Sequence, residues 1–265
     1  MTQPMRKGQA VHRAAWVGAA AAAASASQAR RHPAAALAII ATVGMAGMAA
    51  FMPRTPAFGR SLWRGPADRP RAALTFDDGP GPSTPEVLDA LGREGVRATF
   101  FVLGQQVERH PEIVRRMVAE GHQLANHGYD HGILIFRGAR HVREQLRRTE
   151  RAVERAVGAD AMTRVCRTPH GFRGPATALA CSRAGYRMAA WTHGVFDSAE
   201  PGVAVIARRA SRALAPGTIL LLHDADGWAP GRPRQQTVDA LSEICRSARA
   251  REIELVTLDD LVGAG

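Results

Sequence analysis

The 265-residue sequence contains only three cysteines, and no two of them form a Cys-x-x-Cys pair. Three thiols cannot build a disulfide scaffold for a chain of this length, and the missing pairs exclude zinc-ribbon modules. Cys166, Cys181 and Cys245 stand at apolar positions of expected helices and strands, so we interpret them as buried thiols. Any metal chemistry of this protein must therefore use histidine and carboxylate ligands.

Lysine is almost absent, since Lys7 is its single occurrence, and aromatic residues make up only 5% of the chain. The 35 basic residues are otherwise arginines and, with 24 acidic residues, give a net charge of +11. This bias is typical of a GC-rich genome before it indicates a selected basic surface. Because no aromatic residues interleave with the arginines, no nucleic-acid partner is predicted. Anionic envelope polymers and phospholipid head groups are equally compatible with the charge.

Residues 1–53 lack acidic side chains and contain an uncharged run over residues 34–52, which two arginines precede. A helix of this length crosses most of a bilayer core, because each residue adds about 1.5 Å. The preceding arginines favour an orientation that places everything after the run outside the cytoplasm. We predict an uncleaved membrane anchor or an export signal, because the small residues Gly47 and Ala49 are also compatible with cleavage. A buried core helix is the remaining alternative.

Residues 54–70 are rich in Pro, Gly and Arg and are predicted to be a linker, and residues 71–262 are predicted to form the catalytic domain. In that domain, short β-type runs alternate with helical patterns. Expected strands lie near 72–76, 98–103, 122–126, 163–167, 186–191, 218–222 and 253–257, and expected helices near 84–94, 106–120, 139–157, 175–184, 203–214 and 235–250. This alternation predicts an α/β fold, a deformed (β/α) barrel of about seven parallel strands.

Two adjacent carboxylates, Asp77 and Asp78, follow the first expected strand within the motif TFDDGP. Asp, Gly and Pro are also the common residues of simple turns, so this motif alone is ambiguous. Barrel enzymes carry their catalytic groups at the carboxyl ends of strands, which is where these two residues stand. One carboxylate can bind a metal while the other handles a proton.

His127 and His131 are four residues apart, a spacing that suits a divalent metal with one further protein ligand. Ten histidines in the chain make such a pair weak by itself. The motifs RTPHG, WTHGVFD and LLLHD follow later expected strands, so that five motifs stand at successive strand ends. A carboxylate and two histidines leave coordination sites open for water and substrate.

In this ordered set of motifs the sequence resembles the NodB-homology polysaccharide deacetylases, carbohydrate esterase family four, over roughly residues 70–260. The resemblance implies a metal-dependent hydrolase that removes N-acetyl groups from amino sugars of an envelope polysaccharide, either peptidoglycan or a chitin-like oligosaccharide. It implies that Asp78, His127 and His131 bind a divalent metal, usually Zn²⁺ and sometimes Co²⁺ or another ion. It also implies that Asp77 is the catalytic base.

The other catalytic roles are carried over in the same way. Arg167 matches the arginine that holds the base, and the backbone N–H of His170 falls where the family stabilises the oxyanion. His223 matches the general acid, and Asp197 matches the carboxylate that orients it. These roles are chemically coherent, because a divalent cation lowers the pKa of water from 15.7 toward about 7. An imidazolium paired with a carboxylate can then protonate the departing amine at neutral pH.

Three residues depart from the usual family pattern: Gly128 replaces Ser or Thr, His170 replaces Tyr, and Ser198 replaces Trp. They change the surroundings of the site and leave the sugar substrate open. We predict that Trp191 and Leu222 form the apolar wall for the acetyl methyl group, although both are equally ordinary as core residues.

Two other functions remain open at this point. Deacylation or deformylation of a lipid-linked amino sugar suits a membrane segment and a basic surface. A carbohydrate-binding domain without turnover is the second alternative, and the complete set of motif residues argues against it. We expect a monomer that contacts the membrane through residues 34–52. The catalytic domain is expected on the outer side of the cytoplasmic membrane, or exported to the periplasm or beyond.

Overall fold

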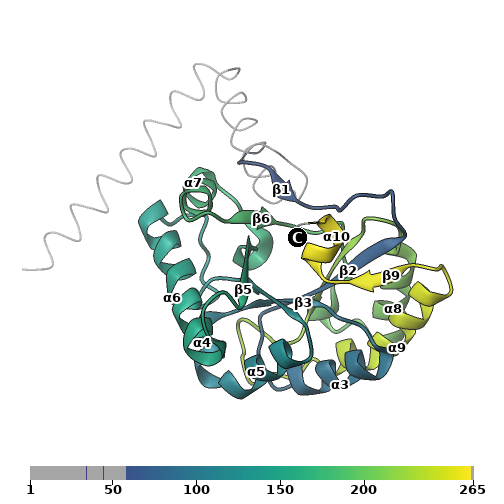
Figure 1. The fold of residues 1–265 in the computed structure, drawn as a ribbon. Helices are drawn as coiled ribbons and strands as arrows, with labels where there is room; N and C mark the ends of the chain where they lie inside the picture. Colours follow the sequence, from purple (N-terminus) through teal and green to yellow (C-terminus); the bar gives the residue numbers. More distant parts are fainter. Residues whose placement is uncertain (1–33, 35–43, 45–57, 264–265) are drawn as a thin grey trace, which may run out of the picture. The chain divides into compact units, whose positions relative to one another are not determined.

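A computed structural model describes residues 58–263 of the chain, together with Ala34 and Gly44. The rest of the predicted membrane segment 34–52 lies outside the described residues, so membrane insertion stays a prediction. Within the part that the structure describes, no helix is both long and apolar enough to cross a membrane. The labelled elements in Figure 1 all belong to residues 58–263.

Nine parallel strands form one curled sheet in the described part of the chain. Their order is β1-β6-β5-β4-β3-β2-β8-β7, and β9 also pairs with β2. The strands are β1 Ser61–Leu62, β2 Arg71–Asp77, β3 Thr99–Val102, β4 Gln123–Asn126, β5 Met162–Cys166, β6 Arg187–Ala189, β7 His193–Gly194, β8 Ile219–His223 and β9 Glu254–Val256. The prediction of a deformed (β/α) barrel is confirmed. The two-residue strands β1 and β7 were not expected, because two residues carry no periodic pattern.

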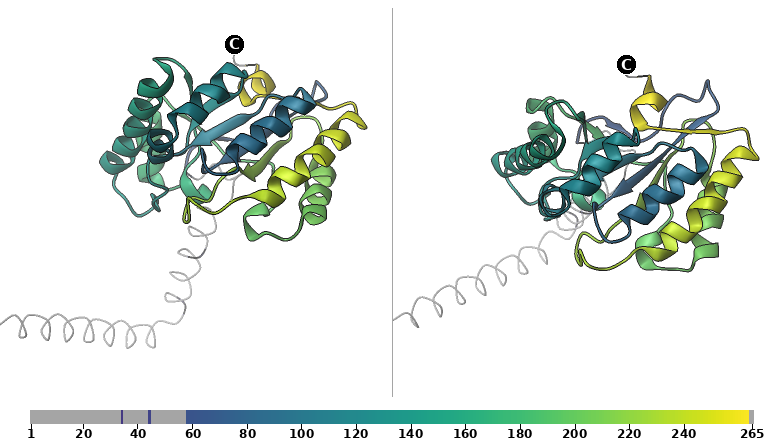
Figure 2. Two further views of the ribbon diagram at one scale, coloured as in Figure 1. Left: turned by 90° about the horizontal axis from the view of Figure 1, so that it is seen from below. Right: turned by 60° about the horizontal axis from the view of Figure 1, so that its bottom comes forward.

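Helices connect most of the successive strands and cover the outside of the sheet. They are α3 Thr84–Glu94, α4 Gly104–Arg109, α5 Pro111–Ala119, α6 Ala139–Val157, α7 Pro175–Arg183, α8 Val203–Ala213, α9 Gln235–Arg249 and α10 Leu258–Val262, with 3₁₀ turns η1 Pro169–Gly171 and η2 Asp197–Ala199. Figure 2 shows α3 and α9 side by side over the sheet. The helix expected near 106–120 is broken at His110, because Pro111 cannot donate a hydrogen bond and begins a new helix.

Alternation along the strands separates the outer core from the inside of the curl. On β2, Leu74 and Phe76 pack in the cluster that includes residues of α3, α8 and α9, whereas Ala73 belongs to a second cluster with Phe101 and Ile219. Successive side chains of a strand point to opposite faces, so Asp77 falls on the same face as Ala73. The strand period therefore directs the first motif carboxylate toward the inside of the sheet.

Part of the predicted linker belongs to the folded unit. Ser61 and Leu62 form β1 and pair with β6, and Gly65 N–H donates to Gly217 O at 2.8 Å. Gly217 has a φ of 79°, and a Cβ atom there would lie 2.4 Å from Gly65 O. The prediction of a linker over residues 54–70 is therefore wrong from Ser61 onward, because backbone pairing rather than side-chain pattern holds this segment.

Candidate active site and metal centre

The five motifs meet at the carboxyl-terminal edge of the sheet. The register places Asp77 at the end of β2 level with His223 at the end of β8. Asn126, which precedes His127, is level with Cys166, which precedes Arg167. Carboxyl ends of parallel strands share one edge, so motifs far apart in the sequence are brought together.

Left-handed backbone conformations are concentrated at this edge. Asp78, His131, His170 and Phe196 have φ values of 80°, 60°, 61° and 57°. All four line one cavity. Such conformations are uncommon for residues other than glycine and cost about 1–3 kcal/mol each, so their clustering marks a functional site.

Asp78, His127 and His131 form a buried cluster with the chemistry of a metal site. Their ligand atoms lie within 4.8 Å of one another. The Nε2 atoms of His127 and His131 approach Asp78 Oδ1 at 3.3 and 3.0 Å. Asp78 Oδ1 is buried and has no satisfactory hydrogen-bond partner, which is unfavourable unless another group binds it. One carboxylate and two imidazoles fit a divalent cation that keeps open coordination sites.

Hydrogen bonds from outside the cluster orient these side chains. His127 Nδ1 lies 2.9 Å from Arg167 O, so this nitrogen donates and Nε2 keeps its lone pair for a ligand. Asp78 Oδ2 accepts from Gly227 N–H at 3.0 Å, which leaves Oδ1 directed at the histidines. These two hydrogen bonds therefore leave His127 Nε2 and Asp78 Oδ1 directed toward each other.

Asp77 stands beside this cluster and is held by a buried arginine. Arg167 donates from Nη1 to Asp77 Oδ1 at 2.6 Å and to Thr75 Oγ1 at 2.9 Å. Its Nη2 donates to Ala190 O at 2.8 Å, and its side chain is fully buried. The other oxygen of Asp77, Oδ2, lies 3.7 Å from His127 Nε2. Asp77 therefore presents one oxygen toward the triad, as a proton acceptor requires.

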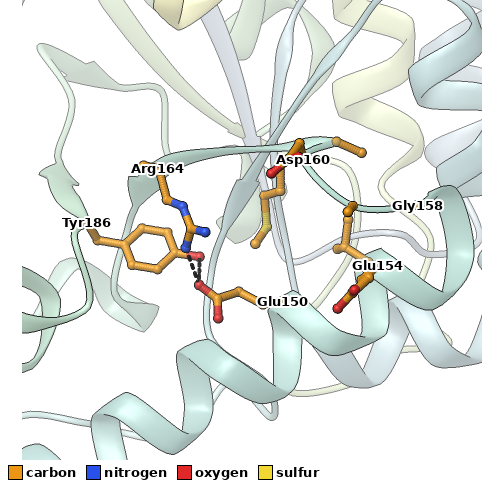
Figure 3. A pocket seen from close by; sticks show the side chains of 10 residues that line it. Glu150, Glu154, Gly158, Asp160, Arg164 and Tyr186 are labelled. Atoms are coloured by element: carbon orange, nitrogen blue, oxygen red, sulfur yellow. Dashed lines mark hydrogen bonds and ion pairs between the residues drawn. The ribbon is translucent and has the colours of Figure 1, made fainter.

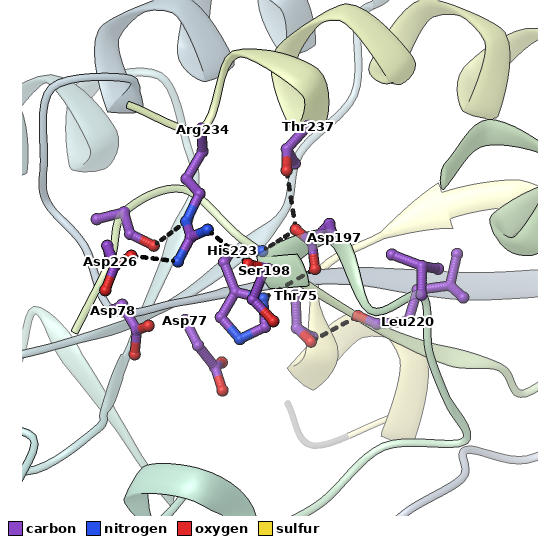
Figure 4. Close-up of polar contacts among 12 residues, drawn as sticks. Thr75, Asp77, Asp78, Asp197, Ser198, Leu220, His223, Asp226, Arg234 and Thr237 are labelled. Atoms are coloured by element: carbon purple, nitrogen blue, oxygen red, sulfur yellow. Dashed lines mark hydrogen bonds and ion pairs between the residues drawn. The ribbon is translucent and has the colours of Figure 1, made fainter. Parts of the chain in front are cut away.

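On the other side of the cavity, Asp197 orients His223 (Figure 4). Asp197 Oδ1 accepts from His223 Nδ1 at 2.9 Å, and Oδ2 accepts from His223 N–H at 2.7 Å and Thr237 Oγ1 at 2.9 Å. Burial lowers the pKa of His223, but the charge and hydrogen bond of Asp197 outweigh it and raise the pKa to about 9. Burial raises the pKa of Asp197, but the charge and hydrogen bonds of His223, together with the hydrogen bond from Thr237, outweigh burial and lower this pKa. The pair therefore keeps a proton on His223 at neutral pH.

A cavity of about 390 Å³ contains the whole arrangement. Trp191 lines it as expected, whereas Leu222 is fully buried in the outer core, and Leu221 lines the cavity instead. The Leu222 prediction was wrong by one residue, because adjacent residues of β8 face opposite sides of the sheet. The lining consists of Asp77, Asp78, His127, His131, His170, Gly171, Phe172, Trp191, Gly194, Phe196, Ser198, Leu221, His223, Asp226, Trp228 and Arg234.

The half-buried side chain of His170 lies against the ring of His131, with 4.4 Å between the ring centroids. Burial is the largest cause that lowers the pKa of His170 to about 4. The imidazole is therefore neutral at neutral pH and does not repel a cation beside it. The role of its backbone N–H in binding an oxyanion stays a prediction.

A second, smaller cavity of about 220 Å³ lies between α6 and β5 (Figure 3). Glu150 accepts there from Tyr186 Oη at 2.8 Å and from Arg164 at 2.7 Å. Tyr186 Oη also accepts from Asn126 Nδ2 at 3.1 Å, so this network fixes the end of β4 just before His127.

Cys166, Cys181 and Cys245 are buried free thiols, as predicted.

The loop between β8 and α9 carries residues that the sequence reading missed. Asp226, Trp228 and Arg234 line the cavity, and Gly227 contacts Asp78. The loop has no periodic pattern, and its contacts join segments distant in the sequence. The one available signal was its place directly after the motif LLLHD.

Comparison with known proteins places this arrangement in a family. A family model described as polysaccharide deacetylase matches residues 64–189. The chain is 39% identical over 197 residues to a chitooligosaccharide deacetylase from Bradyrhizobium sp. (strain ANU 289), and the match covers 71% of this chain and 89% of that protein. The crystal structure of the Bc1960 peptidoglycan N-acetylglucosamine deacetylase matches with a TM-score of 0.70 and 29% identity, over 76% of this chain and 92% of that chain.

The same fold occurs in BA3943, a CE4 family pseudoenzyme from Bacillus anthracis. That structure matches with a TM-score of 0.67 and 23% identity, over 76% of this chain and 68% of that chain. The fold alone therefore does not imply turnover, which has to be argued from the side chains of the site. On the family model, the sequence identity and the shared architecture together, the chain belongs to the polysaccharide deacetylase family of NodB homology, carbohydrate esterase family four.

Proposed function

We propose that this protein is a metal-dependent deacetylase that hydrolyses N-acetyl groups of amino sugars in an envelope glycan, either peptidoglycan or a chitin-like oligosaccharide. One observation carries the proposal: a triad suited to a cation lies in one cavity between Asp77, held by Arg167, and His223, held by Asp197. The printed activities of the relatives, chitooligosaccharide and peptidoglycan N-acetylglucosamine deacetylase, support the substrate class.

Asp78, His127 and His131 would hold the cation, and Zn²⁺ is the ion we propose, because it takes nitrogen and carboxylate ligands. Co²⁺ or another divalent ion would fit the same ligands. When bound, the cation supplies a Lewis acid that polarises the acetyl carbonyl and lowers the pKa of water.

Asp77 acts as the general base. Its free oxygen faces the triad, so it removes the proton from the water whose oxygen attacks the acetyl carbon. Arg167 fixes the carboxylate through its hydrogen bond to Oδ1, which keeps the other oxygen directed at the triad. The backbone N–H of His170 is proposed to donate to the oxyanion that develops during this attack.

His223 acts as the general acid. With its pKa raised to about 9, it carries a proton at neutral pH and donates it to the sugar nitrogen as the C–N bond breaks. The products are acetate and a free amine on the sugar. Trp191 and Leu221 are proposed to form the apolar wall beside the acetyl methyl group.

A lipid-linked amino sugar is less well supported. Arg234 is the one guanidinium among the described residues that line the cavity. It is bonded to Asp226, Ala225 O and Ser198 O, and is therefore already paired. No arginine there is left to bind a lipid phosphate. A binding domain without turnover would not need the complete set of proton-transfer residues.

An envelope substrate would require the catalytic domain to act outside the cytoplasm. The uncharged run 34–52 supports this location, either as an anchor or as an export signal. We propose that the protein acts as a monomer.

Acetate release tests the proposed function. The purified full-length protein would be assayed on acetylated chitooligosaccharides, peptidoglycan fragments and acyl or formyl lipid-linked amino sugars, before and after chelation. We expect release from the first two substrates, loss with chelator and recovery on adding Zn²⁺. Turnover of the lipid-linked substrate alone would favour the alternative, and no release from any substrate by metal-loaded protein would contradict deacetylation.

A further inference from the structure

The active-site cavity has two exposed aromatic side chains at its surface. Trp228 and Phe196 are each 69% exposed, and both line the cavity. Among the described residues, Phe136 is the one further aromatic side chain that is at least as exposed, with an exposed fraction of 88%. Phe136 does not line the cavity. Large apolar side chains left in solvent beside a cavity mark a ligand contact, because exposure there has no packing benefit.

The indole of Trp228 stands next to the proposed metal site. Its ring stacks on His170 with 5.1 Å between centroids and 25° between planes. It also meets the ring of His131 edge-on at 5.7 Å. His170 therefore supports one face of the indole, and the high exposure of Trp228 shows that much of the remaining surface is open to solvent.

Buried contacts hold this exposed side chain in place. The backbone N–H groups of Trp228 and Ala229 both donate to Asp226 Oδ1 at 2.9 Å. Asp226 Oδ2 pairs with Arg234 at 2.9 Å, and the guanidinium also donates from Nε to Ala225 O (Figure 4). Both charged side chains are more than nine-tenths buried. A buried ion pair is costly unless it is well bonded, so the loop is fixed on both sides of Trp228.

A rigid indole with an open face is suited to one class of ligand. The face of an aromatic ring is apolar and carries partial negative charge, which matches the C–H-rich face of a pyranose ring. We propose that Trp228, backed by His170, is a stacking platform for a pyranose ring of the substrate glycan. This inference rests on the proposed function. The platform is preorganised, so little ordering cost is incurred when the sugar binds.

Steady-state kinetics on the full-length, metal-loaded protein test the platform. Acetate release would be measured on chitooligosaccharides of increasing length for the wild type, Trp228→Ala, Trp228→Phe and the control Phe136→Ala. We expect Trp228→Ala to raise KM about ten-fold with kcat changed less than about two-fold, because stacking lowers the energies of bound substrate and transition state together. Trp228→Phe, which keeps an aromatic ring, should have a KM close to that of the wild type. Phe136→Ala should have the same KM and kcat as the wild type.

An unchanged KM in Trp228→Ala would overturn the platform, as would a loss confined to kcat with reduced metal content. Calorimetry with the Asp77→Asn protein separates this inference from the proposed function. The dissociation constant of a chitooligosaccharide would be compared between Asp77→Asn and the double variant Asp77→Asn, Trp228→Ala. A dissociation constant about ten-fold higher in the double variant supports the platform even if the wild type releases no acetate. If neither protein binds any oligosaccharide, the platform is excluded.

Discussion

Gly227 donates its backbone N–H to Asp78 Oδ2 at 3.0 Å, and a Cβ atom on Gly227 would lie only 2.3 Å from Nδ1 of His131. Two of the three proposed metal ligands are thus in contact with one glycine. The hydrogen bond fixes the rotation of the Asp78 carboxylate, and the missing side chain leaves room for the imidazole. Contacts of this kind orient ligands without touching the metal.

We therefore expect Gly227→Ala to weaken metal binding about 10–100-fold, because the new methyl group must displace His131 or the loop. Competition with a metal chelator measures the affinity. Gly231→Ala is the matched control in the same loop, since a Cβ atom there meets nothing within 4 Å. Equal affinity in the two variants would show that Gly227 does not position the site.

Asp78→Ala, His127→Ala and His131→Ala should each lose bound metal and activity together, because three protein ligands leave none to spare. The fold should persist, since the cluster lies at the edge of the sheet rather than in the outer core. Metal analysis and circular dichroism measure the two properties. His193→Ala, which changes an exposed histidine, is the control. Full metal occupancy in His127→Ala would contradict the ligand assignment.

Asp77→Asn should keep the metal and lose about 10²–10⁴-fold in kcat, the usual contribution of a general base. Asp78→Asn, by contrast, should lose metal, because its unpaired Oδ1 faces both histidines. Parallel metal analysis and kinetics on the two neighbouring variants separate the roles. Equal metal loss in both variants would contradict the assignment of Asp77 as the base and Asp78 as the metal ligand.

The rate should fall as the pH rises through the pKa of His223, about 9, because the protonated imidazole is the acid and deprotonation removes it. Asp197 raises this pKa through its charge and hydrogen bond. Asp197→Asn should therefore move the alkaline limb of the kcat/KM profile to lower pH. Profiles of the wild type and this variant provide the measurement, and an unmoved limb would exclude His223 as the acid.

Residues 34–52 should direct the catalytic domain to the outer side of the cytoplasmic membrane. A reporter fused after Gly265 that is active only outside the cytoplasm tests this, with deletion of residues 34–52 as the control. Fractionation then separates an anchor from a cleaved signal. An inactive reporter on the undeleted chain, with the fusion protein recovered from the cytoplasm, would refute export.

Strand and helix positions followed from local patterns in the sequence. The apolar run around Leu74 and Phe76 marked β2, and the amphipathic pattern over 139–157 matched the bounds of α6. Turn residues directly after the strands marked the motif positions, so Asp77, His127 and His223 could be expected at one sheet edge. Periodicity and turn chemistry depend on neighbouring residues, which is why the sequence patterns determined the fold class and placed the two carboxylates and the histidine pair at strand ends. The choice of Asp78 as the third metal ligand came from the family resemblance.

The contacts around the site were decided by the tertiary structure, because they depend on which distant segments of the chain lie against each other. Gly227 lies 149 residues from Asp78, its hydrogen-bond partner, and Arg234 lies 36 residues from Ser198. The choice of Leu221 over Leu222 depended on where β8 begins, since one residue reverses the face of a strand. Trp228 became a candidate only when its indole was found stacked on His170. Local patterns carry no information on such pairings, because their energies arise from packing between elements that the chain separates.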